Sequence, residues 1–534
     1  MSTEHTIGTW LFDRAALTPD RTAIRYGDRR VSYARLAAGA MARAADFAGR
    51  GLRPGDRVAT LARNCPEQVE VFFGCAASGA IMVPLGWRLT AAELGYQLAD
   101  SAPALLMAEP ALADLATAAL SDAAALSGLA AGREEPAGGG TAGPELVPLA
   151  ALPAGALPAG ALPAGALPAG AEHGGRAGPD APVTDTDPVL ILYTSGTTGR
   201  PKGAVLSHAN CFWTNLSLDR TAELTGDDGV LQVLPQCHVG GWNVQPLLAW
   251  WKGAEVVLEQ TFEPDRVLAL IGGGQVTTMM GVPTNYQMLA EHPEFARTDL
   301  SGLRRVIVGG APMPRPLLDR WHARGVTVLQ GYGLTEAAPN VLCVPPEYAR
   351  AKVGSAGRPY PHLRVALRDL NGTGLVAGPA TGELLVAGPN VFAGYWRAPE
   401  ATAAVLRDGW LATGDIAERD PDGFYWIRGR MKDMYISGGE NVYPAEVEEV
   451  LAGHPGIAEA AVIGVPDQRW GETGLAFLVL RDGAAVTAAD ATGYCRTRLA
   501  GYKVPRRYQF LAELPRLSSG KIDKVTLRTR AADG

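Results

Sequence analysis

The chain has 534 residues, with 48 Lys and Arg against 55 Asp and Glu, which gives a formal net charge of -7. This length predicts more than one domain, and the acidic balance argues against a nucleic-acid partner. Its six cysteines form no Cys-x-x-Cys pair or zinc-ligand pattern with the histidines, and no stretch approaches the roughly 20 apolar residues of a membrane span. The N-terminus also lacks the basic start and apolar run of a targeting signal. We therefore expect a soluble cytoplasmic protein with reduced thiols.

The N-terminal region alternates short apolar runs with helical patterns. Strands are expected at residues 57–61, 80–84 and 104–108, and helices at residues 66–79 and 91–100. This alternation is typical of βαβ units on a parallel sheet.

From residue 111 to residue 187 the composition shifts to Ala, Gly and Pro. The sequence Ala-Leu-Pro-Ala-Gly occurs four times in residues 151–170. Few large apolar groups are present to offset the entropy of ordering the chain, and a proline in every repeat interrupts both helix and sheet. We predict a disordered surface insertion at about residues 132–186, and a tolerated insertion is favoured over a docking role for the repeat.

A loop rich in hydroxyls and glycines follows the apolar run 189–192. It reads Tyr-Thr-Ser-Gly-Thr-Thr-Gly-Arg-Pro-Lys-Gly over residues 193–203. The glycines let a ligand approach the backbone, the hydroxyls and amides donate hydrogen bonds, and the lysine adds a positive charge, which favours a polyphosphate loop over a flexible turn. The spacing is not that of a Walker loop, because Gly196 and Gly199 are too close and Gly203 follows the lysine. The residues expected to bind the polyphosphate here are Thr194, Ser195, Gly196, Thr197, Thr198 and Lys202.

Residues 193–203 match the signature loop of the adenylate-forming superfamily, which the chain resembles over nearly its whole length. This superfamily contains acyl- and aryl-CoA synthetases, luciferases and the adenylation domains of peptide synthetases. Further family motifs recur in order at residues 331–336, 413–415, 429–448 and 519–521. The resemblance implies an α/β fold, with a large N-terminal domain of layered sheets and helices at residues 1–429. It also implies a small mobile C-terminal α+β domain at residues 430–534.

Apolar runs after the loop, at residues 230–234, 254–258, 276–280 and 304–308, predict further strands. Ligands bind near the carboxyl ends of such strands, and the loops 308–312 and 328–336 could together enclose a purine. The resemblance implies that Tyr332 stacks on adenine and that Gln330 contacts its exocyclic amine. It also implies that Thr335 touches the α-phosphate and that Glu336 holds Mg²⁺. The remaining nucleotide-site residues expected here are Gly310, Ala311, Pro312 and Gly331.

His238 lies in the segment Cys-His-Val-Gly-Gly-Trp at residues 237–242. A single histidine is more often a core residue, but acyl-CoA synthetases carry a His-x-x-Gly segment at this position. The resemblance implies an imidazole that borders the carboxylate pocket and neutralises or orients the acid. Relatives usually have an aromatic residue where this chain has Cys237, so the pocket shape is expected to differ. The expected acyl-pocket residues, which favour a bulky or long acid, are Gly240, Gly241, Trp242 and Gly309.

Two motifs lie before and across the start of the expected small domain. The resemblance implies that Asp415, in Thr-Gly-Asp, accepts two ribose hydroxyls and that Arg430 contacts the ribose. Lys432 or its neighbour is then the hinge, and Gly438 and Gly439 line a channel for the pantetheine arm of CoA. Glycines suit that channel because a thin thiol-bearing chain must pass beside the backbone.

The last hundred residues predict a small α/β unit. Strands are expected at residues 458–465 and 475–480, and an amphipathic helix at residues 488–499. A lysine near a C-terminus is usually solvent-exposed and silent. Lys521, however, matches the family's terminal Ser-Gly-Lys motif, and the resemblance implies that it reaches across the domain gap to the acid and the α-phosphate.

Taken together, the motifs imply an ATP-dependent carboxylic acid-CoA ligase that uses ATP, Mg²⁺ and coenzyme A. The acid would form acyl-AMP and release pyrophosphate, and a thiol would then attack the acyl-AMP. The alternatives are an adenylating enzyme that passes acyl-AMP to a carrier protein or a partner enzyme, and a luciferase-like monooxygenase. A non-catalytic binding module is disfavoured because Glu336, Asp415 and Lys521 are all present. The acid, an acyl-carrier-protein partner and a homodimer are left open.

Overall fold

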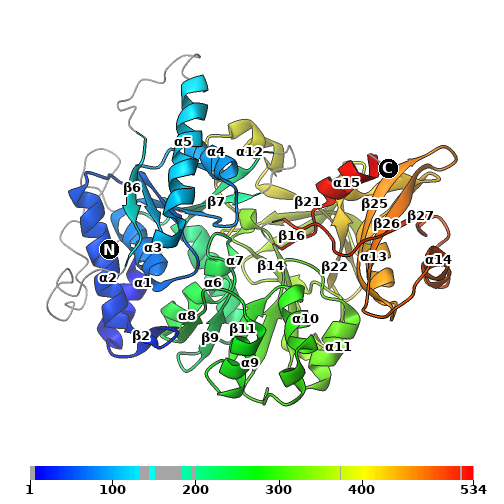
Figure 1. The fold of residues 1–534 in the computed structure, drawn as a ribbon, viewed down its shortest axis with the longest axis horizontal. Coiled ribbons are helices and arrows are strands. Elements are labelled where there is room, and N and C mark those ends of the chain that lie inside the picture. Colours follow the sequence, from blue (N-terminus) through cyan, green and yellow to red (C-terminus); the bar gives the residue numbers. More distant parts are fainter. Residues whose placement is uncertain are drawn as a thin grey trace.

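The computed structural model describes residues 6–130, 143–150, 183–194, 200–372, 374–517 and 520–532. Within these residues the chain has an α/β fold built from four sheets and the helices that cover them (Figure 1). Three sheets belong to the N-terminal body, which we define as the described residues up to 430. The fourth belongs to the C-terminal lobe, residues 435–532, at the right of Figure 1. The short 3-10 helix Met431–Asp433 connects the two.

The first sheet has the strand order β19-β8-β7-β4-β3-β5-β6. Strands β3, β4 and β5 run parallel and are joined by helices, which confirms the predicted βαβ units. Strands β7 and β8 form an antiparallel hairpin in which Thr194 is opposite Lys202, so the expected phosphate loop closes this hairpin. The elements are β3 Arg57–Leu61, α3 Pro66–Ser78, β4 Ile81–Leu85, α4 Ala91–Ser101, β5 Leu105–Ala108, α5 Ala113–Ala130, β6 Glu145–Pro148, β7 Pro188–Thr194, β8 Lys202–Ser207 and β19 Gly394–Tyr395.

The second sheet has the order β15-β14-β13-β12-β11-β9-β10-β1-β2. Its central strands are parallel and nearly continuously apolar, as expected for strands with both faces buried. The carboxyl ends of β12 and β13 lead into the two loops expected to enclose a purine. The strands are β1 Thr22–Tyr26, β2 Arg29–Ser32, β9 Gly229–Gln232, β10 Glu255–Leu258, β11 Thr278–Gly281, β12 Arg305–Val308, β13 Val328–Gly333, β14 Asn340–Cys343 and β15 Arg358–Pro359. Helices of the body outside the first sheet are α1 Gly8–Leu17, α2 Tyr33–Gly49, α6 His208–Ala222, α7 Gly240–Asn243, α8 Pro246–Lys252, α9 Pro264–Gly272, α10 Pro283–Glu291, α11 Arg315–Ala323 and α12 Pro399–Val405.

The third sheet is antiparallel and carries the ribose-site motifs. In it, Asp415 of β21 lies opposite Arg430 of β22, so register alone brings these two predicted residues together. Its strands are β16 Arg364–Arg368, β17 Leu375–Val376, β18 Ala380–Ala387, β20 Leu406–Arg407, β21 Trp410–Arg419 and β22 Tyr425–Arg430.

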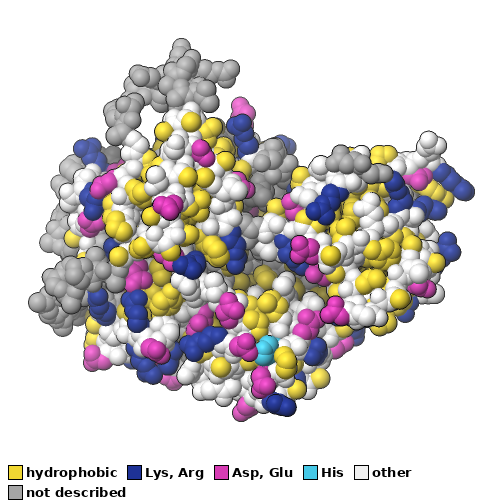
Figure 2. All heavy atoms as spheres, in the orientation of Figure 1, with side chains coloured by type: hydrophobic (Ala, Val, Ile, Leu, Met, Phe, Trp, Pro, Cys, Tyr) yellow, Lys and Arg dark blue, Asp and Glu magenta, His cyan; other side chains and the backbone are white. Residues whose placement is uncertain are grey.

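The C-terminal lobe is a sheet of order β24-β23-β26-β25, with β27 paired to β26, and it separates two apolar clusters. Its long hairpin extends further than the sequence predicts, because strand pairing continues past the apolar residues. In the space-filling view the surface is indented between the lobe and the body, with acidic and basic side chains along the indentation (Figure 2). The elements are β23 Tyr435–Ser437, β24 Glu440–Val442, α13 Pro444–Ala452, β25 Ile457–Asp467, β26 Gly471–Leu480, α14 Ala488–Arg496, β27 Arg507–Phe510 and α15 Lys524–Ala532.

The prediction of disorder at about residues 132–186 is wrong in part, because strand β6 lies within that range. Helix α5 occupies residues 113–130, before the predicted insertion, and packs on α4; its alanines favour a helix. Strand β6, at residues 145–148, extends the first sheet beside β5 through backbone hydrogen bonds, which need few apolar side chains. The four repeats, residues 151–170, lie outside the described residues. None of the helices in the described part of the chain is both long and apolar enough to cross a membrane.

Candidate active site

Three motifs that are far apart in the sequence meet at Asp415. The hydroxyl of Tyr332, at the end of β13, donates a hydrogen bond to Oδ2 of Asp415, and Nε of Arg430 lies 2.6 Å from Oδ1. The Asp415 side chain is 5% exposed, and this burial raises the pKa of the carboxyl, while Arg430 and Tyr332 act in the opposite direction. Burial beside Asp415 also raises the pKa of the Tyr332 hydroxyl, which keeps it a donor. The residues assigned to ribose and adenine therefore form one hydrogen-bonded group.

The glycine-rich loop after β12 is exposed at residues 310–312 and buried at Gly309. Gln330 holds this loop in place, because its Oε1 accepts a hydrogen bond from the backbone N of Met313 at 3.3 Å. Its Nε2 donates to the carbonyl of Ser355 at 3.1 Å. The side chain of Gln330 thus cross-links backbone segments, and its expected contact with an adenine amine stays a prediction.

Glu336 lies where the first sheet meets the loop after β13. Its Oε1 accepts a hydrogen bond from the hydroxyl of Tyr395 at 2.8 Å and lies 3.5 Å from Oγ1 of Thr194. The ammonium of Lys202 lies over the ring of Tyr395, 5.3 Å from its centroid. The hairpin stem of the phosphate loop is therefore adjacent to the carboxylate expected to hold Mg²⁺. The loop residues expected to bind ATP between these stems, Ser195, Gly196, Thr197 and Thr198, lie outside the described residues.

The single carboxylate of Glu336 fits a magnesium ion that is also bound by the phosphates of a nucleotide. No group of three or more His, Cys, Asp or Glu side chains that could hold a metal ion occurs in the part of the chain that the structure describes. Magnesium usually binds through one or two carboxylates together with substrate phosphates. A single carboxylate beside a phosphate loop supplies the protein's share of such a site.

Lys521, in the C-terminal lobe, lies within electrostatic range of Asp415, Arg430 and Glu336 of the N-terminal body. Its backbone is held in a tight turn, in which the N–H of Leu517 donates to the carbonyl of Lys521 at 2.8 Å and Arg516 forms a β-bridge with Ile522. Although the side chain keeps exposed surface, removal of surrounding water lowers the pKa of Lys521. Arg430 acts in the same direction, whereas the nearby carboxylates of Asp415 and Glu336 oppose it. The lysine is therefore within electrostatic range of both acidic site residues.

His238, which lies within electrostatic range of Lys521, is an uncharged imidazole. Burial lowers the pKa of His238 to about 4, and Lys521 and the exposed Arg88 act in the same direction. In the unliganded protein at neutral pH this side chain is therefore uncharged and suited to orient a carboxylate by hydrogen bonding. Thr335 lies half-buried in the turn that also carries Glu336.

Trp242 does not form an exposed wall of an acyl pocket in this conformation. Its indole is fully buried and stacks on Phe72, with the ring centroids 4.6 Å apart, and its Nε1 donates to the carbonyl of Gln236. Gly241 is likewise packed tightly, since a Cβ there would lie 2.6 Å from the carbonyl of Pro235. Both residues thus hold α7 against the core, while Gly240 and Gly309 remain candidates for the pocket surface.

The residues expected to form the hinge and the pantetheine channel lie on the surface. Lys432, Gly438 and Gly439 are all exposed. The two glycines have φ of 63° and 87°, a left-handed backbone that disfavours other residues. A Cβ at Gly438 would also lie 2.8 Å from the ring of Trp470.

The sequence reasoning missed Tyr395, which contacts both Lys202 and Glu336. It lies in the two-residue strand β19, which is too short for a periodic pattern. The available signal was Gly394-Tyr395-Trp396, a glycine followed by two aromatic residues between the adenine and ribose motifs.

Comparison with known proteins gives one family match in the N-terminal body and another in the C-terminal lobe. A family model described as AMP-binding enzyme matches residues 11–396, and one described as AMP-binding enzyme C-terminal domain matches residues 446–521. The chain belongs to the AMP-binding enzyme family. This membership confirms the resemblance to adenylate-forming enzymes that the motifs predict.

Similar members of the AMP-binding enzyme family align along nearly the full chain. A feruloyl-CoA synthase of an Amycolatopsis species is 42% identical over 98% of this chain and 99% of its own length. The crystal structure of ATP-bound MatB from Rhodopseudomonas palustris superposes with a TM-score of 0.85 at 31% identity, covering 99% of both chains. The o-succinylbenzoate coenzyme A synthetase of Bacillus subtilis, in complex with ATP and magnesium ion, superposes with a TM-score of 0.81. It has 31% identity and covers 97% of this chain and 99% of its own.

Proposed function

We propose that this protein is an AMP-forming carboxylic acid-CoA ligase that works through an acyl-AMP intermediate. The observation that carries the proposal is that Lys521, from the C-terminal lobe, lies within electrostatic range of Glu336 and Asp415 of the N-terminal body. The end-to-end similarity to a feruloyl-CoA synthase supports the same reaction class. A binding module would have no need to bring a lysine from a separate lobe to two carboxylates.

In the first half-reaction, a carboxylate oxygen of the acid attacks the α-phosphorus of ATP. The bond from that phosphorus to the bridging oxygen of pyrophosphate breaks, and pyrophosphate leaves with the electron pair. In this proposal the ammonium of Lys521 stabilises the negative charge that develops on the α-phosphate oxygens. Magnesium, when bound with ATP, would supply further charge neutralisation at the phosphates, with Glu336 as its protein ligand.

The N-terminal body orients the two reactants of this step. Asp415 accepts hydrogen bonds and is suited to the two ribose hydroxyls, provided that they displace or share its bonds from Tyr332 and Arg430. His238, uncharged at neutral pH, orients the acid as a hydrogen-bonding partner. Holding both reactants in one geometry lowers the entropic part of the barrier.

In the second half-reaction, the thiol of CoA attacks the acyl carbonyl, and AMP leaves with the bridging oxygen. This step needs space beside the carbonyl that Lys521 occupies in the first step. We infer that the lobe turns about Lys432, which is exposed in the short connection between body and lobe, and that residues 438 and 439 then line the thiol channel. In this proposal the mobile unit is residues 430–534 and the rest is residues 1–429.

For the acid we propose a bulky aryl carboxylic acid, because feruloyl and o-succinylbenzoyl groups name the products or substrates of full-length relatives. The use of ATP and CoA supports a location in the cytoplasm, where both are abundant. A carrier-protein thiol is the alternative acceptor that the test below separates from CoA.

The test measures both half-reactions of the purified protein. A panel of aryl acids, long-chain fatty acids and short dicarboxylic acids is assayed for acid-dependent exchange of labelled pyrophosphate into ATP, and for acyl-CoA by mass spectrometry. We expect aryl acids to support both exchange and thioester formation. Exchange without any CoA thioester would mean that the acyl group goes to another acceptor. Absence of acid-dependent exchange with every acid in the panel would refute the proposal.

A further inference from the structure

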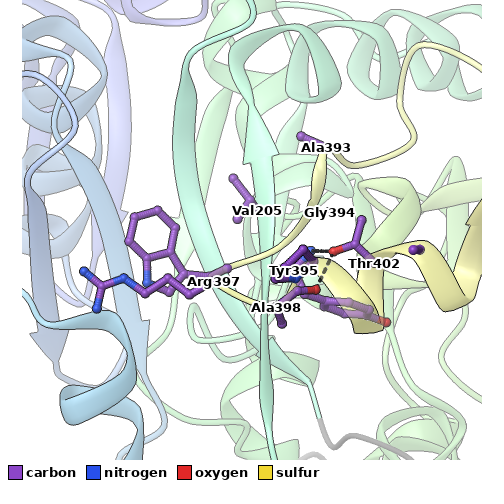
Figure 3. Close-up of a pocket in the computed structure, with 10 residues that line it drawn as sticks. Val205, Ala393, Gly394, Tyr395, Arg397, Ala398 and Thr402 are labelled. Carbon is purple, nitrogen blue, oxygen red and sulfur yellow. Dashed lines mark hydrogen bonds between the residues drawn. The ribbon is translucent and has the colours of Figure 1, made fainter. Parts of the chain in front are cut away.

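Tyr395 is held firmly by the elements around it, although it lies in a strand of only two residues. In β19, Gly394 pairs with Val205 and Tyr395 pairs with Ala204 of β8. The backbone N–H of Tyr395 donates to Oγ1 of Thr402 in α12 at 2.9 Å, and Figure 3 shows this bond beside the tyrosine ring. A Cβ at residue 394 would lie 2.7 Å from the Thr402 side chain, so the glycine permits this close approach.

The hydroxyl of Tyr395 holds one oxygen of the Glu336 carboxylate. It donates to Oε1 at 2.8 Å, and Oγ1 of Thr194 lies 3.5 Å from the same atom. Within the described residues, Oε2 has no such hydrogen bond, which leaves it available to a ligand. The same segment also holds the Glu336 backbone, because the N–H of Phe392 donates to the Glu336 carbonyl at 2.9 Å.

The ring of Tyr395 contacts the cation of the phosphate loop. The Lys202 ammonium lies 5.3 Å from the ring centroid, within the range of a cation–π interaction. No ion pair joins Lys202 to Glu336 in the part of the chain described by the structure. The tyrosine therefore contacts both a cation suited to phosphate and a carboxylate suited to metal.

We propose that Tyr395 is a positioning residue that fixes the carboxylate of Glu336 for the magnesium ion of bound ATP and keeps Lys202 apart from that carboxylate. The inference rests on the proposed adenylation reaction for its biological meaning. Hydrogen bonds to metal-ligating carboxylates orient the ligand, and their loss typically weakens metal binding or activity about 10- to 100-fold. Tyr395 should therefore affect magnesium use before it affects stability or thioester formation.

Two variants separate the hydroxyl from the ring. Tyr395→Phe keeps the ring under Lys202 but removes the bond to Glu336, and Tyr395→Leu removes both. Tyr33→Phe is the matched control, because it also deletes one tyrosine hydroxyl in the N-terminal body. In the native protein that hydroxyl donates to the carbonyl of Ala254 at 2.7 Å, away from the site.

The experiment measures metal binding directly and each half-reaction separately. Electron paramagnetic resonance follows Mn²⁺ binding to the protein in the presence of α,β-methylene-ATP. Pyrophosphate exchange is measured against Mg²⁺ concentration, and thioester formation is measured from supplied acyl-AMP and CoA. For Tyr395→Phe we expect the Kd for Mn²⁺ and the Mg²⁺ requirement to rise about 10- to 100-fold. Thioester formation should stay within about twofold of wild type, and Tyr33→Phe should bind Mn²⁺ normally.

Two results would overturn the inference. One is an unchanged Kd for Mn²⁺ in Tyr395→Phe. The other is equal loss of both half-reactions with a lower unfolding midpoint and no change in metal binding, which would indicate a purely structural residue. If wild-type protein forms no acyl-CoA but Tyr395→Phe still weakens Mn²⁺ binding in the nucleotide complex, the proposed ligase reaction fails and the positioning role stands.

Discussion

Replacing Lys521 with alanine should impair adenylation and spare thioester formation. The turn that presents this lysine is held by backbone hydrogen bonds and by the bridge between Arg516 and Ile522, none of which uses the lysine side chain. In the described part of the chain its ammonium makes no ion pair within 4 Å, so its removal breaks no ion pair there. Loss of one preorganised charge at an adenylation transition state corresponds to about 2.7 to 4 kcal/mol, or roughly 10²- to 10³-fold in rate.

The stability of this variant should hold or improve. Because the pKa of Lys521 is lowered in the folded protein, the unfolded chain binds more protons between the folded and unfolded pKa values. The charged lysine therefore lowers stability below that window, and stability recovers as the pH rises through it. Adenylation should follow the opposite course and fall as the lysine deprotonates. Lys521→Arg should lose this alkaline fall, because arginine stays charged.

The assay compares pyrophosphate exchange with thioester formation from supplied acyl-AMP in the same preparation. Lys524→Ala is the matched control, because Lys524 is three residues away and its ammonium lies 2.6 Å from Glu448 within the lobe. We expect it to change stability by about 0 to 1 kcal/mol and to leave the ratio of the two half-reactions unaltered. If Lys521→Ala exchanges pyrophosphate at the wild-type rate, the lysine has no chemical role. If it loses both half-reactions equally, it supports the lobe instead.

Three further perturbations test other parts of the site and the fold. Asp415→Asn removes the negative charge beside Arg430 from a side chain that is 5% exposed. The KM for ATP, measured by steady-state kinetics, should rise about 10- to 100-fold, and an unchanged KM would contradict the ribose role of Asp415. His208 is fully buried, its Nδ1 accepts a hydrogen bond from the backbone N of Ile7 at 3.3 Å, and burial lowers its pKa to about 4. The free energy of unfolding should therefore fall as the pH drops from about 6.5 to about 4. Urea titrations at several pH values should show a shallower fall for His208→Leu than for the native protein. An equal dependence of the unfolding free energy on pH in both proteins would show that His208 is not its source. Lys432→Pro restricts the backbone in the connection between body and lobe and should slow thioester formation far more than pyrophosphate exchange, whereas equal slowing would mean that the pivot lies elsewhere.

The parallel strands and the motif positions could be predicted from the sequence because each depends on local pattern. Buried parallel strands are continuous apolar runs, and the Thr-Gly-Asp and Ser-Gly-Lys motifs are short enough to recognise without a structure. Strand register then brings Asp415 opposite Arg430, which the sequence alone does not encode in any local pattern.

The features that could not be predicted from the sequence depend on contacts between segments that are far apart along the chain. Strand β6 forms because β5 offers an unpaired edge, not because its own four residues are apolar. Trp242 is buried because Phe72, in α3, provides a stacking partner. The uncharged state of His238 follows from burial and from the cations of Arg88 and Lys521, which are more than 100 residues away in the sequence. Tyr395 becomes visible as a site residue only when β19 pairs with the phosphate-loop hairpin.

The central claim is that the acid's own oxygen becomes bonded to the α-phosphorus of ATP before the thiol reacts. An acid that supports turnover can be prepared with ¹⁸O in both carboxylate positions and incubated with the protein, ATP, Mg²⁺ and CoA, and the nucleotide product is then analysed by mass spectrometry. The account predicts AMP that carries one ¹⁸O atom, together with unlabelled pyrophosphate and a thioester that retains the other label. Unlabelled AMP, or ADP with labelled phosphate, would contradict an acyl-AMP route.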